Sequence, residues 1–366
     1  MKDLVNIQNN NNLTGSYPLF LGQDLGFADT VNITYPELYE LKNLMLSQYW
    51  VPEEFYLDGD RKDLQSCPDS IRQVMILNLM SQWLLDSVAS RSIVETFGAF
   101  TTNSELVDLF LVWSTFESIH ASAYSLIIRQ CFSNPNKIIE DAKKNIKVAY
   151  RSRIIGKVFN ETNQLAARYT LGEIIPEEVL KKQIFKTVVT LYSLEAISFM
   201  ASFACTFALT ATGKFQGIGN EVALICRDEM IHAKAGRTIA DILMKVEGYD
   251  IYFEDLKDEI RTIFDEVVKQ EMAWSEYIFE DDRHVLGLTT EMLKDYVRFL
   301  AKPAYERFGL TWDETRFGVA PKRNPVPYMD QYTDPDSVQA ANQEIEQINY
   351  RIGAVVDDTT DEIFDF

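Results

Sequence analysis

Two Glu-x-x-His motifs place an acid and an imidazole on the same side of a helix. Glu117 and His120 frame the first motif, and Glu229 and His232 frame the second, each within a run that reads as helical. Residues three apart on a helix project to one face, so each motif presents a carboxylate and a ring nitrogen together. Both groups are common metal ligands. The sequence therefore predicts that each motif supplies two ligands to a metal site.

An isolated acid precedes each motif in an otherwise apolar segment, Asp86 before the first and Glu195 before the second. Four helices would thus bring four carboxylates and two imidazoles into one interior, as in ferritin-like carboxylate proteins, with aspartate replacing one glutamate. Four ionised carboxylates are costly to bury together, and two divalent ions would neutralise them. Oxygen and imidazole donors without thiolates favour iron or manganese over structural zinc and leave open positions for dioxygen. We therefore expect a redox-active di-iron centre.

A single acid-x-x-His triplet is weak evidence for a metal site, because many such triplets are ordinary surface pairs on helices. Asp281-Asp-Arg-His284 is a third example in this chain. We interpret His284 as a loop residue, since charges surround it and no buried acid matches it. The first two motifs differ because each lies in an apolar helix with its own upstream acid, and that pairing favours a metal site.

Tyr124 lies one turn beyond His120 on the predicted ligand face. Spacing alone makes it a packed core tyrosine, as most tyrosines on apolar helix faces are. Beside a di-iron centre, however, a phenol can give up an electron and a proton. Apolar neighbours would shield the resulting radical from water, and we expect Phe199, Phe203 and Ile225 to provide that shield.

The elements that must carry these residues are long helices. The chain has 366 residues, 46% of them hydrophobic, which is ample for a large core. Helical periodicity dominates and alternating strand patterns are almost absent, which predicts an all-α fold, a ferritin-like helical bundle. Pro36 favours a helix start before 37–50, and Pro52 favours its end. The other predicted helices cover residues 69–97, 104–133, 137–168, 177–212, 219–247, 254–279 and 290–308.

The composition of the chain limits the kinds of partner and the cellular locations that we expect. The formal net charge of -20 argues against nucleic acid as a partner. The four cysteines show no C-x-x-C spacing and the N-terminus lacks the regions of a signal peptide, so we expect a cytoplasmic location. Residues 196–213 form an uncharged run long enough for a membrane helix. Small and polar residues are frequent in it and basic or aromatic flanks are missing, so we interpret it as a buried bundle helix and expect no membrane.

Three regions are expected along the chain: an N-terminal extension over residues 1–34, a helical domain over 35–330 and a C-terminal tail over 331–366. The tail has nine acids against one arginine and no core-forming periodicity, which predicts a flexible acidic segment. A solubilising end is one interpretation. Apolar residues up to the terminal Phe366 favour the other, a segment that folds onto a partner protein.

Taken together, the chain resembles the small (beta) subunit of class I ribonucleotide reductase, and most closely its aerobic tyrosyl-radical members. The similarity extends over nearly the whole chain, with no departure at the predicted ligands or at the tyrosine. The motifs that carry it are Tyr49-Trp50-x-Pro52-Glu53-Glu54, Leu84-Leu85-Asp86-Ser87, Phe116-Glu117-x-Ile-His120-x3-Tyr124, Leu194-Glu195-Ala196-Ile197-x-Phe199, Ser202-Phe203-Ala204-Cys205 and Ala223-x3-Arg227-Asp228-Glu229-x2-His232.

The resemblance implies a role for each matched residue. One iron would be bound by Asp86, Glu117 and His120, and the other, with carboxylates bridging the two ions, by Glu195, Glu229 and His232. Tyr124 would be the radical tyrosine. Trp50 and Asp228 would link the buried centre to the surface. Tyr350 would relay the radical to the large subunit, with the tail acid Glu344 also implicated, and the last residues of the tail would dock on that subunit.

The implied activity is that of ribonucleoside-diphosphate reductase, which needs both subunits. Reduction of dioxygen to water would take two electrons from the iron(II) ions, one from Tyr124 and one from an external donor. The stored radical would then move reversibly to a cysteine of the large subunit, where a ribonucleoside diphosphate loses its 2′-hydroxyl. We also expect a homodimer. Di-manganese is the less favoured metal pair, because the chain length and the motifs near both ends favour iron.

Two alternatives remain open at this point. A di-iron oxygenase or desaturase could use a similar ligand set, but it would need a substrate channel and has no reason to combine Trp50, Tyr124 and a tail tyrosine. A non-catalytic ferritin-like iron-binding protein usually has a shorter chain and would not need the acidic tail.

Overall fold

The helices of this protein begin and end at residues suited to those positions. Pro36 is the first residue of α2, where its missing N–H costs nothing. The side chain of Asn103 accepts a hydrogen bond from the amide of Leu106 and so caps the start of α5. Gly248 has φ +71° in the turn after α11, a left-handed conformation that glycine adopts without strain. The residues at the ends of these helices therefore determine where each helix begins and ends.

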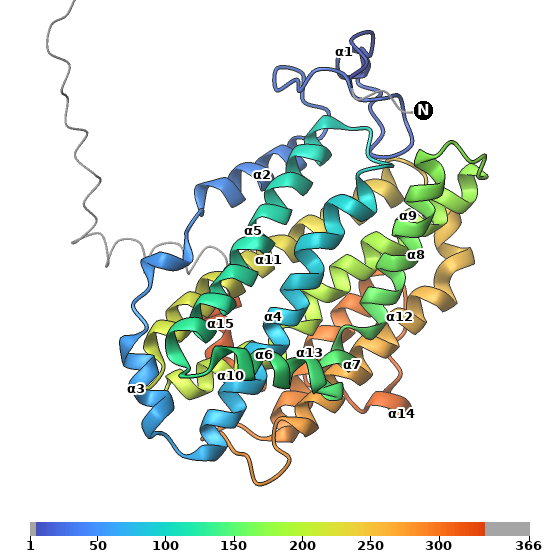
Figure 1. Cartoon of the computed structure of the whole chain (residues 1–366). Coiled ribbons are helices and arrows are strands. Elements are labelled where there is room, and N and C mark those ends of the chain that lie inside the picture. Colours follow the sequence, from blue (N-terminus) through green and yellow to red (C-terminus); the bar gives the residue numbers. More distant parts are fainter. Residues whose placement is uncertain (1–4, 334–366) are drawn as a thin grey trace, which may run out of the picture.

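The computed structural model describes residues 5–333. Within that range the chain forms helices and turns, with isolated bridges in place of strands (Figure 1). The helices are α1 (Asn11–Thr14), α2 (Pro36–Ser47), α3 (Asp58–Ser66), α4 (Asp69–Phe97), α5 (Ser104–Cys131), α6 (Pro135–Lys144), α7 (Ile146–Arg151), α8 (Arg153–Thr170), α9 (Glu177–Ser193), α10 (Met200–Thr210), α11 (Gln216–Lys245), α12 (Asp250–Tyr277), α13 (Thr290–Arg307), α14 (Glu314–Phe317) and α15 (Asp330–Thr333). A π-turn (Leu194–Ser198) joins α9 to α10, and 3-10 turns cover Pro52–Glu54 and Pro327–Met329.

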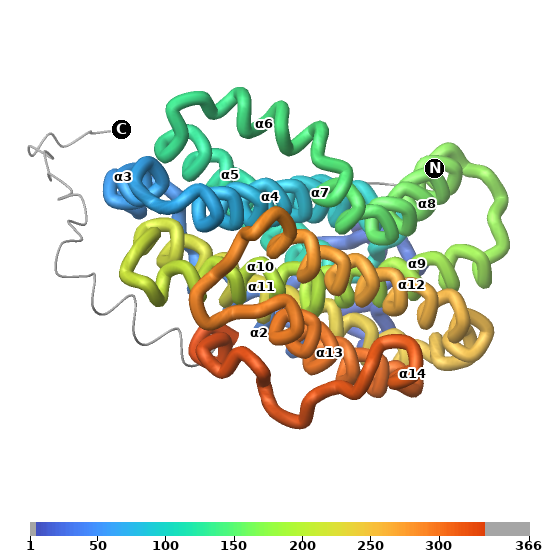
Figure 2. Tube along the Cα trace, turned by 90° about the horizontal axis from the view of Figure 1, so that it is seen from below, coloured from blue at the N-terminus to red at the C-terminus, as the bar shows by residue number. Residues whose placement is uncertain are grey.

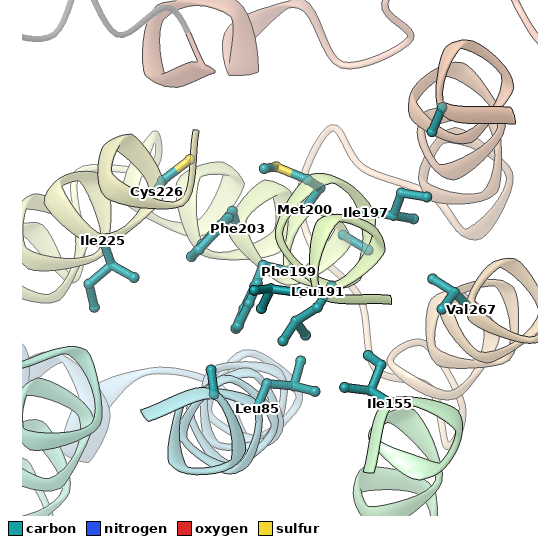
Figure 3. Close-up of a cluster of buried hydrophobic side chains, with 14 of the residues drawn as sticks. Leu85, Ile155, Leu191, Ile197, Phe199, Met200, Phe203, Ile225, Cys226 and Val267 are labelled. Carbon is teal, nitrogen blue, oxygen red and sulfur yellow. The ribbon is translucent and has the colours of Figure 1, made fainter. Parts of the chain in front are cut away.

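The long helices pack in layers around a continuous apolar core. Figure 2 shows α4, α5 and α8 on one side of the bundle, α13 and α14 on the other, and α9, α10 and α11 between them. Helix α4 packs against α5, and α9 packs against both α11 and α12. Leu85 of α4, Leu191 of α9 and Ile225 of α11 belong to one cluster of buried apolar side chains (Figure 3). The four helical segments expected to carry metal ligands are therefore neighbours.

Two of the predicted helices are interrupted. The segment predicted as one helix over 137–168 is three helices, α6, α7 and α8. The side chain of Asn145 accepts from the amides of Lys147 and Val148 and so caps the start of α7. The second interruption is at Ser152, whose side chain makes no cap hydrogen bond. The segment predicted over 177–212 contains the π-turn that joins α9 to α10. The predicted helix over 37–50 ends at Ser47, before Trp50. The other long predictions agree with the observed helices within a few residues.

One helical stretch, Glu177–Thr210, is long and apolar enough to cross a membrane by composition, with a mean hydropathy of 1.6 over its most apolar window. In this structure 94% of that window is buried inside the protein. It is the central helix of the bundle, as the sequence interpretation of residues 196–213 expected.

The two ends of the chain differ in what the structure describes. Part of the expected N-terminal extension lies against the bundle: the amide of Leu19 donates to Glu247 at 2.7 Å, and the amide of Leu21 donates to the carbonyl of Phe100 at 2.9 Å. Most of the expected tail, with Glu344 and Tyr350, lies outside the described residues.

Candidate metal centre

The structure brings all six predicted ligands together in the middle of the bundle. Each of the six side chains is 0% exposed. Asp86 comes from α4, Glu117 and His120 from α5, Glu195 from the π-turn, and Glu229 and His232 from α11. Four separate segments therefore converge on one buried point, as the pairing of each Glu-x-x-His motif with an upstream acid predicted.

The donor atoms form two overlapping groups, each within 4.8 Å. The first contains Glu117, Glu195, Glu229 and His232, and the second contains Asp86, His120 and Glu229. Glu229 belongs to both groups and is placed to bridge them. The grouping differs from the partition implied by the resemblance in one respect, because Glu117 lies with the Glu195 group and not with Asp86.

Many donor atoms at this point have no hydrogen-bond partner among residues 5–333. Buried polar atoms are nearly always paired in proteins, so a concentration of unpaired ones indicates a missing ligand. His120 Nδ1 and Glu229 Oε1 are 3.1 Å apart, yet neither makes a hydrogen bond. The unpaired atoms in the six side chains are both oxygens of Asp86 and of Glu195, Glu117 Oε2, His120 Nδ1, Glu229 Oε1 and His232 Nε2. Oxygen and imidazole donors of this kind fit two divalent cations.

Burial and mutual repulsion perturb the carboxyl groups strongly. Burial, followed by the charges of Glu229 and Glu117, raises the pKa of Asp86 well above its usual range. The pKa of Glu195 rises in the same way, through burial and the charges of Glu117 and Glu229. Without cations these carboxyls would hold protons, because two ionised carboxylates cannot lie unpaired in an apolar interior. Divalent ions would displace those protons and compensate the charge.

For the two imidazoles, the effect of the neighbouring carboxylates on the pKa outweighs the effect of burial. Burial alone would lower the pKa of His232, but its contacts with Glu117 and Glu229 raise it to about 9. Burial likewise opposes protonation of His120, yet Glu229 and Asp228 raise the pKa of that ring well above its usual range. The same contacts lower the pKa of Glu229, against the effect of its burial. The neighbouring carboxylates therefore favour positive charge at both rings, and a metal ion would replace the protons that the rings hold.

Trp113 is a site residue that the sequence interpretation missed. Its indole Nε1 donates to Glu117 Oε1 at 3.1 Å, and its ring stacks on His232 with centroids 5.0 Å apart. Such contacts fix the orientation of side chains that could bind a metal ion. The available signal was its position four residues before Glu117, which places both on one face of α5.

Trp50 and Asp228 form a continuous contact to the site. The indole Nε1 of Trp50 donates to Asp228 Oδ2 at 2.8 Å, and the same oxygen lies 3.2 Å from His120 Nε2. Arg227 donates to the other oxygen of Asp228 at 2.9 Å. The rings of Trp50 and His120 are nearly parallel, with centroids 6.1 Å apart. A hydrogen-bonded path thus leads from His120 to Trp50, next to the half-exposed Tyr49.

Tyr124 lies on α5 and is 0% exposed, and its hydroxyl has no hydrogen-bond partner among residues 5–333. Burial, and then the charge of Asp86, raises its pKa well above the usual range. Phe199, Phe203 and Ile225, the predicted shielding residues, are each fully buried in the same core cluster (Figure 3). Tyr124 is therefore a neutral phenol that shares the buried core with these three apolar side chains.

Two further features lie away from the site. His284 is in an exposed loop, as its interpretation as a loop residue expected, and its Nδ1 lies 3.3 Å from Ser70 Oγ. A broad surface groove follows the outer faces of α4 and α5, lined by residues such as Ser87 and Ser118, and none of the six predicted ligands lines it.

The geometry defines a class of protein: a helical bundle with a buried di-metal site built from carboxylates and histidines. Comparison with known proteins identifies the family. Residues 28–325 match the family described as ribonucleotide reductase, small chain. A ribonucleoside-diphosphate reductase subunit beta of Buchnera aphidicola is 30% identical over 362 residues, which cover 95% of each chain.

Solved structures agree on the fold. The ribonucleotide reductase R2 subunit from Clostridium botulinum matches with a TM-score of 0.75 at 22% identity, covering 87% of this chain and 94% of that one. The Streptococcus sanguinis dimanganese(II)-NrdF matches with a TM-score of 0.66 at 17% identity, covering 83% and 98%.

This chain belongs to the ribonucleotide reductase small-chain family. The predicted family, the all-α ferritin-like fold and the predicted enzyme class are thereby confirmed. The family and the ligand cluster support a di-metal site, and membership of the small chain implies a large-subunit partner.

Proposed function

We propose that this chain is the radical-generating subunit of a ribonucleoside-diphosphate reductase. Its two metal ions would be held by Asp86, Glu117, His120, Glu195, Glu229 and His232. The observation that carries the proposal is the convergence of these six buried side chains at one point of the bundle. Within the described part of the chain, many of their donor atoms and the buried hydroxyl of Tyr124 have no hydrogen-bond partner. The catalytic residues would be Tyr124, Trp50, Asp228 and Tyr350.

The proposed metal pair is iron. When bound, two iron(II) ions would supply two of the four electrons that reduce dioxygen to water. Tyr124 would supply the third electron together with its phenolic proton, and an external donor would supply the fourth. Manganese uses the same donor atoms, and one structural neighbour is a dimanganese protein. The length of the chain and the motifs near both of its ends resemble those of the tyrosyl-radical members of the family, and this resemblance favours iron.

Tyr124 would store the oxidising equivalent. Complete burial excludes water and reductants from its ring, and the absence of a hydrogen-bond partner in the described part of the chain leaves its hydroxyl unanchored to protein. The fully buried Phe199, Phe203 and Ile225 would protect the radical. The path from His120 through Asp228 to Trp50 would then connect the buried site to the surface by coupled electron and proton transfer.

The proposed partners follow from the same assignment. The acidic tail over 331–366 would dock on the large subunit, with Tyr350 as the relay tyrosine and Glu344, six residues before it in the sequence, also involved in the relay. The helical domain over 35–330, with its extension over 1–34, would pair with a second copy as a homodimer. We further propose a cytoplasmic location, with no nucleic acid or membrane as partner. A ferritin-like oxygenase remains the main competitor, but the surface groove on α4 and α5 does not include the ligands.

Separated subunits test this proposal. The apoprotein is loaded with iron(II), exposed to oxygen and assayed for deoxynucleotide formation with and without the large subunit from the same source. We expect product only with both subunits. Deletion of residues 331–366 should leave the radical intact and abolish turnover, because the docking segment and Tyr350 are lost. Full turnover by the shortened chain would refute the role of the tail, and product from this chain alone would refute its assignment as a subunit.

A further inference from the structure

The π-turn that carries Glu195 interrupts the regular hydrogen bonding of the central helix. Leu194–Ser198 is π-helical between α9 and α10. Such turns insert a residue into a helix and are frequent at functional sites. Beyond the turn, the amide of Ser202 donates to the carbonyl of Phe199, three residues back, at 3.0 Å. The carbonyl of Ser198 therefore lies where the helix changes its hydrogen-bonding pattern.

A buried arginine from another helix donates to that carbonyl. Arg151 is the last residue of α7, is 1% exposed, and donates through Nη2 to the carbonyl of Ser198. Its Nη1 donates to Ser202 Oγ at 2.7 Å and also to Ser81 Oγ. Glu271 of α12 accepts from Nε at 2.8 Å and from Nη2 at 2.6 Å. All five N–H groups of the guanidinium are thus paired, three of them with the central helix and α4.

The orientation of this guanidinium is fixed on its flat face as well. The ring of Trp274 lies 4.5 Å from the guanidinium carbon, a cation–π contact. Both charges of the Arg151–Glu271 pair are fully buried. Buried ion pairs contribute little net stability, since replacing them by apolar residues of similar volume is often neutral or stabilising. A contribution to the stability of the bundle therefore does not account for the burial of this ion pair.

We propose that Arg151, held in place by Glu271, is a positioning residue for Glu195. By donating to the carbonyl of Ser198, it fixes the end of the π-turn and with it the direction in which the Glu195 carboxylate projects. Glu195 belongs to only one of the two donor groups, that of Glu117, Glu229 and His232. Loss of Arg151 should therefore weaken one metal position selectively. The inference rests on the proposed role of Glu195 as a ligand.

The test is metal binding to the full-length apoprotein, with manganese(II) as the probe. The variant Arg151→Met/Glu271→Leu removes both charges together, so that neither is left unpaired. We expect wild-type protein to bind two ions and to show the electron paramagnetic resonance of a magnetically coupled pair. The variant should bind one ion at close to wild-type affinity and the second about 10 to 100 times more weakly, as for other contacts that orient a ligand. Its spectrum should be that of isolated manganese(II).

A matched control keeps the contact to Ser198 and removes its neighbours. Ser81→Ala/Ser202→Ala deletes two hydroxyl partners of Arg151 and should retain both ions. If the Met/Leu variant does not fold, Arg151→Gln/Glu271→Gln replaces it, because the two amides can bond to each other while glutamine is too short to serve Ser198. Two ions bound with wild-type affinities in either folded variant would overturn the inference. Wild-type protein that binds two manganese ions but forms no radical with iron would instead overturn the proposed function alone.

Discussion

Glu221 is a buried acid whose burial gives a quantitative prediction. It lies on α11, is 0% exposed, and neither carboxyl oxygen has a hydrogen-bond partner among residues 5–333. Burial, followed by the charges of Asp60 and Glu53, raises its pKa from 4.5 to about 9. The folded protein therefore holds this proton over a pH range in which the unfolded chain releases it. The resulting stabilisation is fully present below pH 4.5 and is lost as the pH rises toward 9.

The size of the effect follows from linkage. Between the two pKa values, each pH unit changes the free energy of unfolding by about 1.4 kcal/mol. From about pH 5.5 to about pH 7.5, Glu221 should thus cost the folded state roughly 3 kcal/mol of stability. Glutamine has nearly the same shape and carries no charge at any of these pH values. The Glu221→Gln variant should therefore gain roughly 3 kcal/mol relative to wild type over that interval.

Urea unfolding of the metal-free protein measures this difference. The midpoint and slope are compared at several pH values for wild type and Glu221→Gln. The infrared difference spectrum of the two proteins at neutral pH should show the loss of one protonated carboxylic acid in the variant, while the bands of other buried carboxyls cancel. Glu306→Gln, at an exposed carboxylate, is the control for the change in net charge. Parallel pH dependences for wild type and Glu221→Gln would refute the reasoning, because they would mean that Glu221 is ionised in the folded protein.

Two other predictions concern the site itself. Metal binding at neutral pH should release protons, and the metal affinity should rise with pH, because the pKa of Asp86 is raised and that of His232 is about 9. Calorimetry in buffers of different ionisation enthalpy measures the number of protons released. Binding heats that do not depend on the buffer would contradict this prediction. Trp50→Phe removes the hydrogen bond to Asp228 and should lower turnover with the large subunit by about 100-fold or more, equivalent to about 2.7 kcal/mol of activation free energy, while the radical yield is unchanged. Trp312→Phe, which removes a 2.9 Å indole hydrogen bond far from the site, is the control and should leave turnover intact.

Periodicity was sufficient to predict which six side chains the structure brings together, because each Glu-x-x-His pair occupies one face of one helix. Glu117 with His120, and Glu229 with His232, are linked by spacing that helix geometry fixes. The single acids Asp86 and Glu195 could be matched to them because each is isolated among apolar residues. The all-α fold followed from the same periodicity. Which donor atoms lie within one group depends on how the helices cross, and spacing within a helix carries no information about that.

The features that the sequence did not reveal depend on contacts between distant segments. The Arg151–Glu271 pair joins α7 to α12, and neither residue is unusual in its own segment. The π-turn at Leu194–Ser198 lies in a run with uninterrupted helical character, so nothing in its composition distinguishes it from a regular helix. Glu221 reads as a solvated acid until the packing of α3 against α11 is known. These residues are identified by their buried surroundings, which only the folded chain defines.

The central claim is that this chain stores an oxidising equivalent on Tyr124. Electron paramagnetic resonance of apoprotein treated with iron(II) and oxygen tests it most directly, with Tyr124→Phe measured beside wild type and the iron content of both determined. We predict a stable organic radical in wild type that is absent from Tyr124→Phe, with two iron ions bound in each. The same radical signal in Tyr124→Phe would contradict the claim.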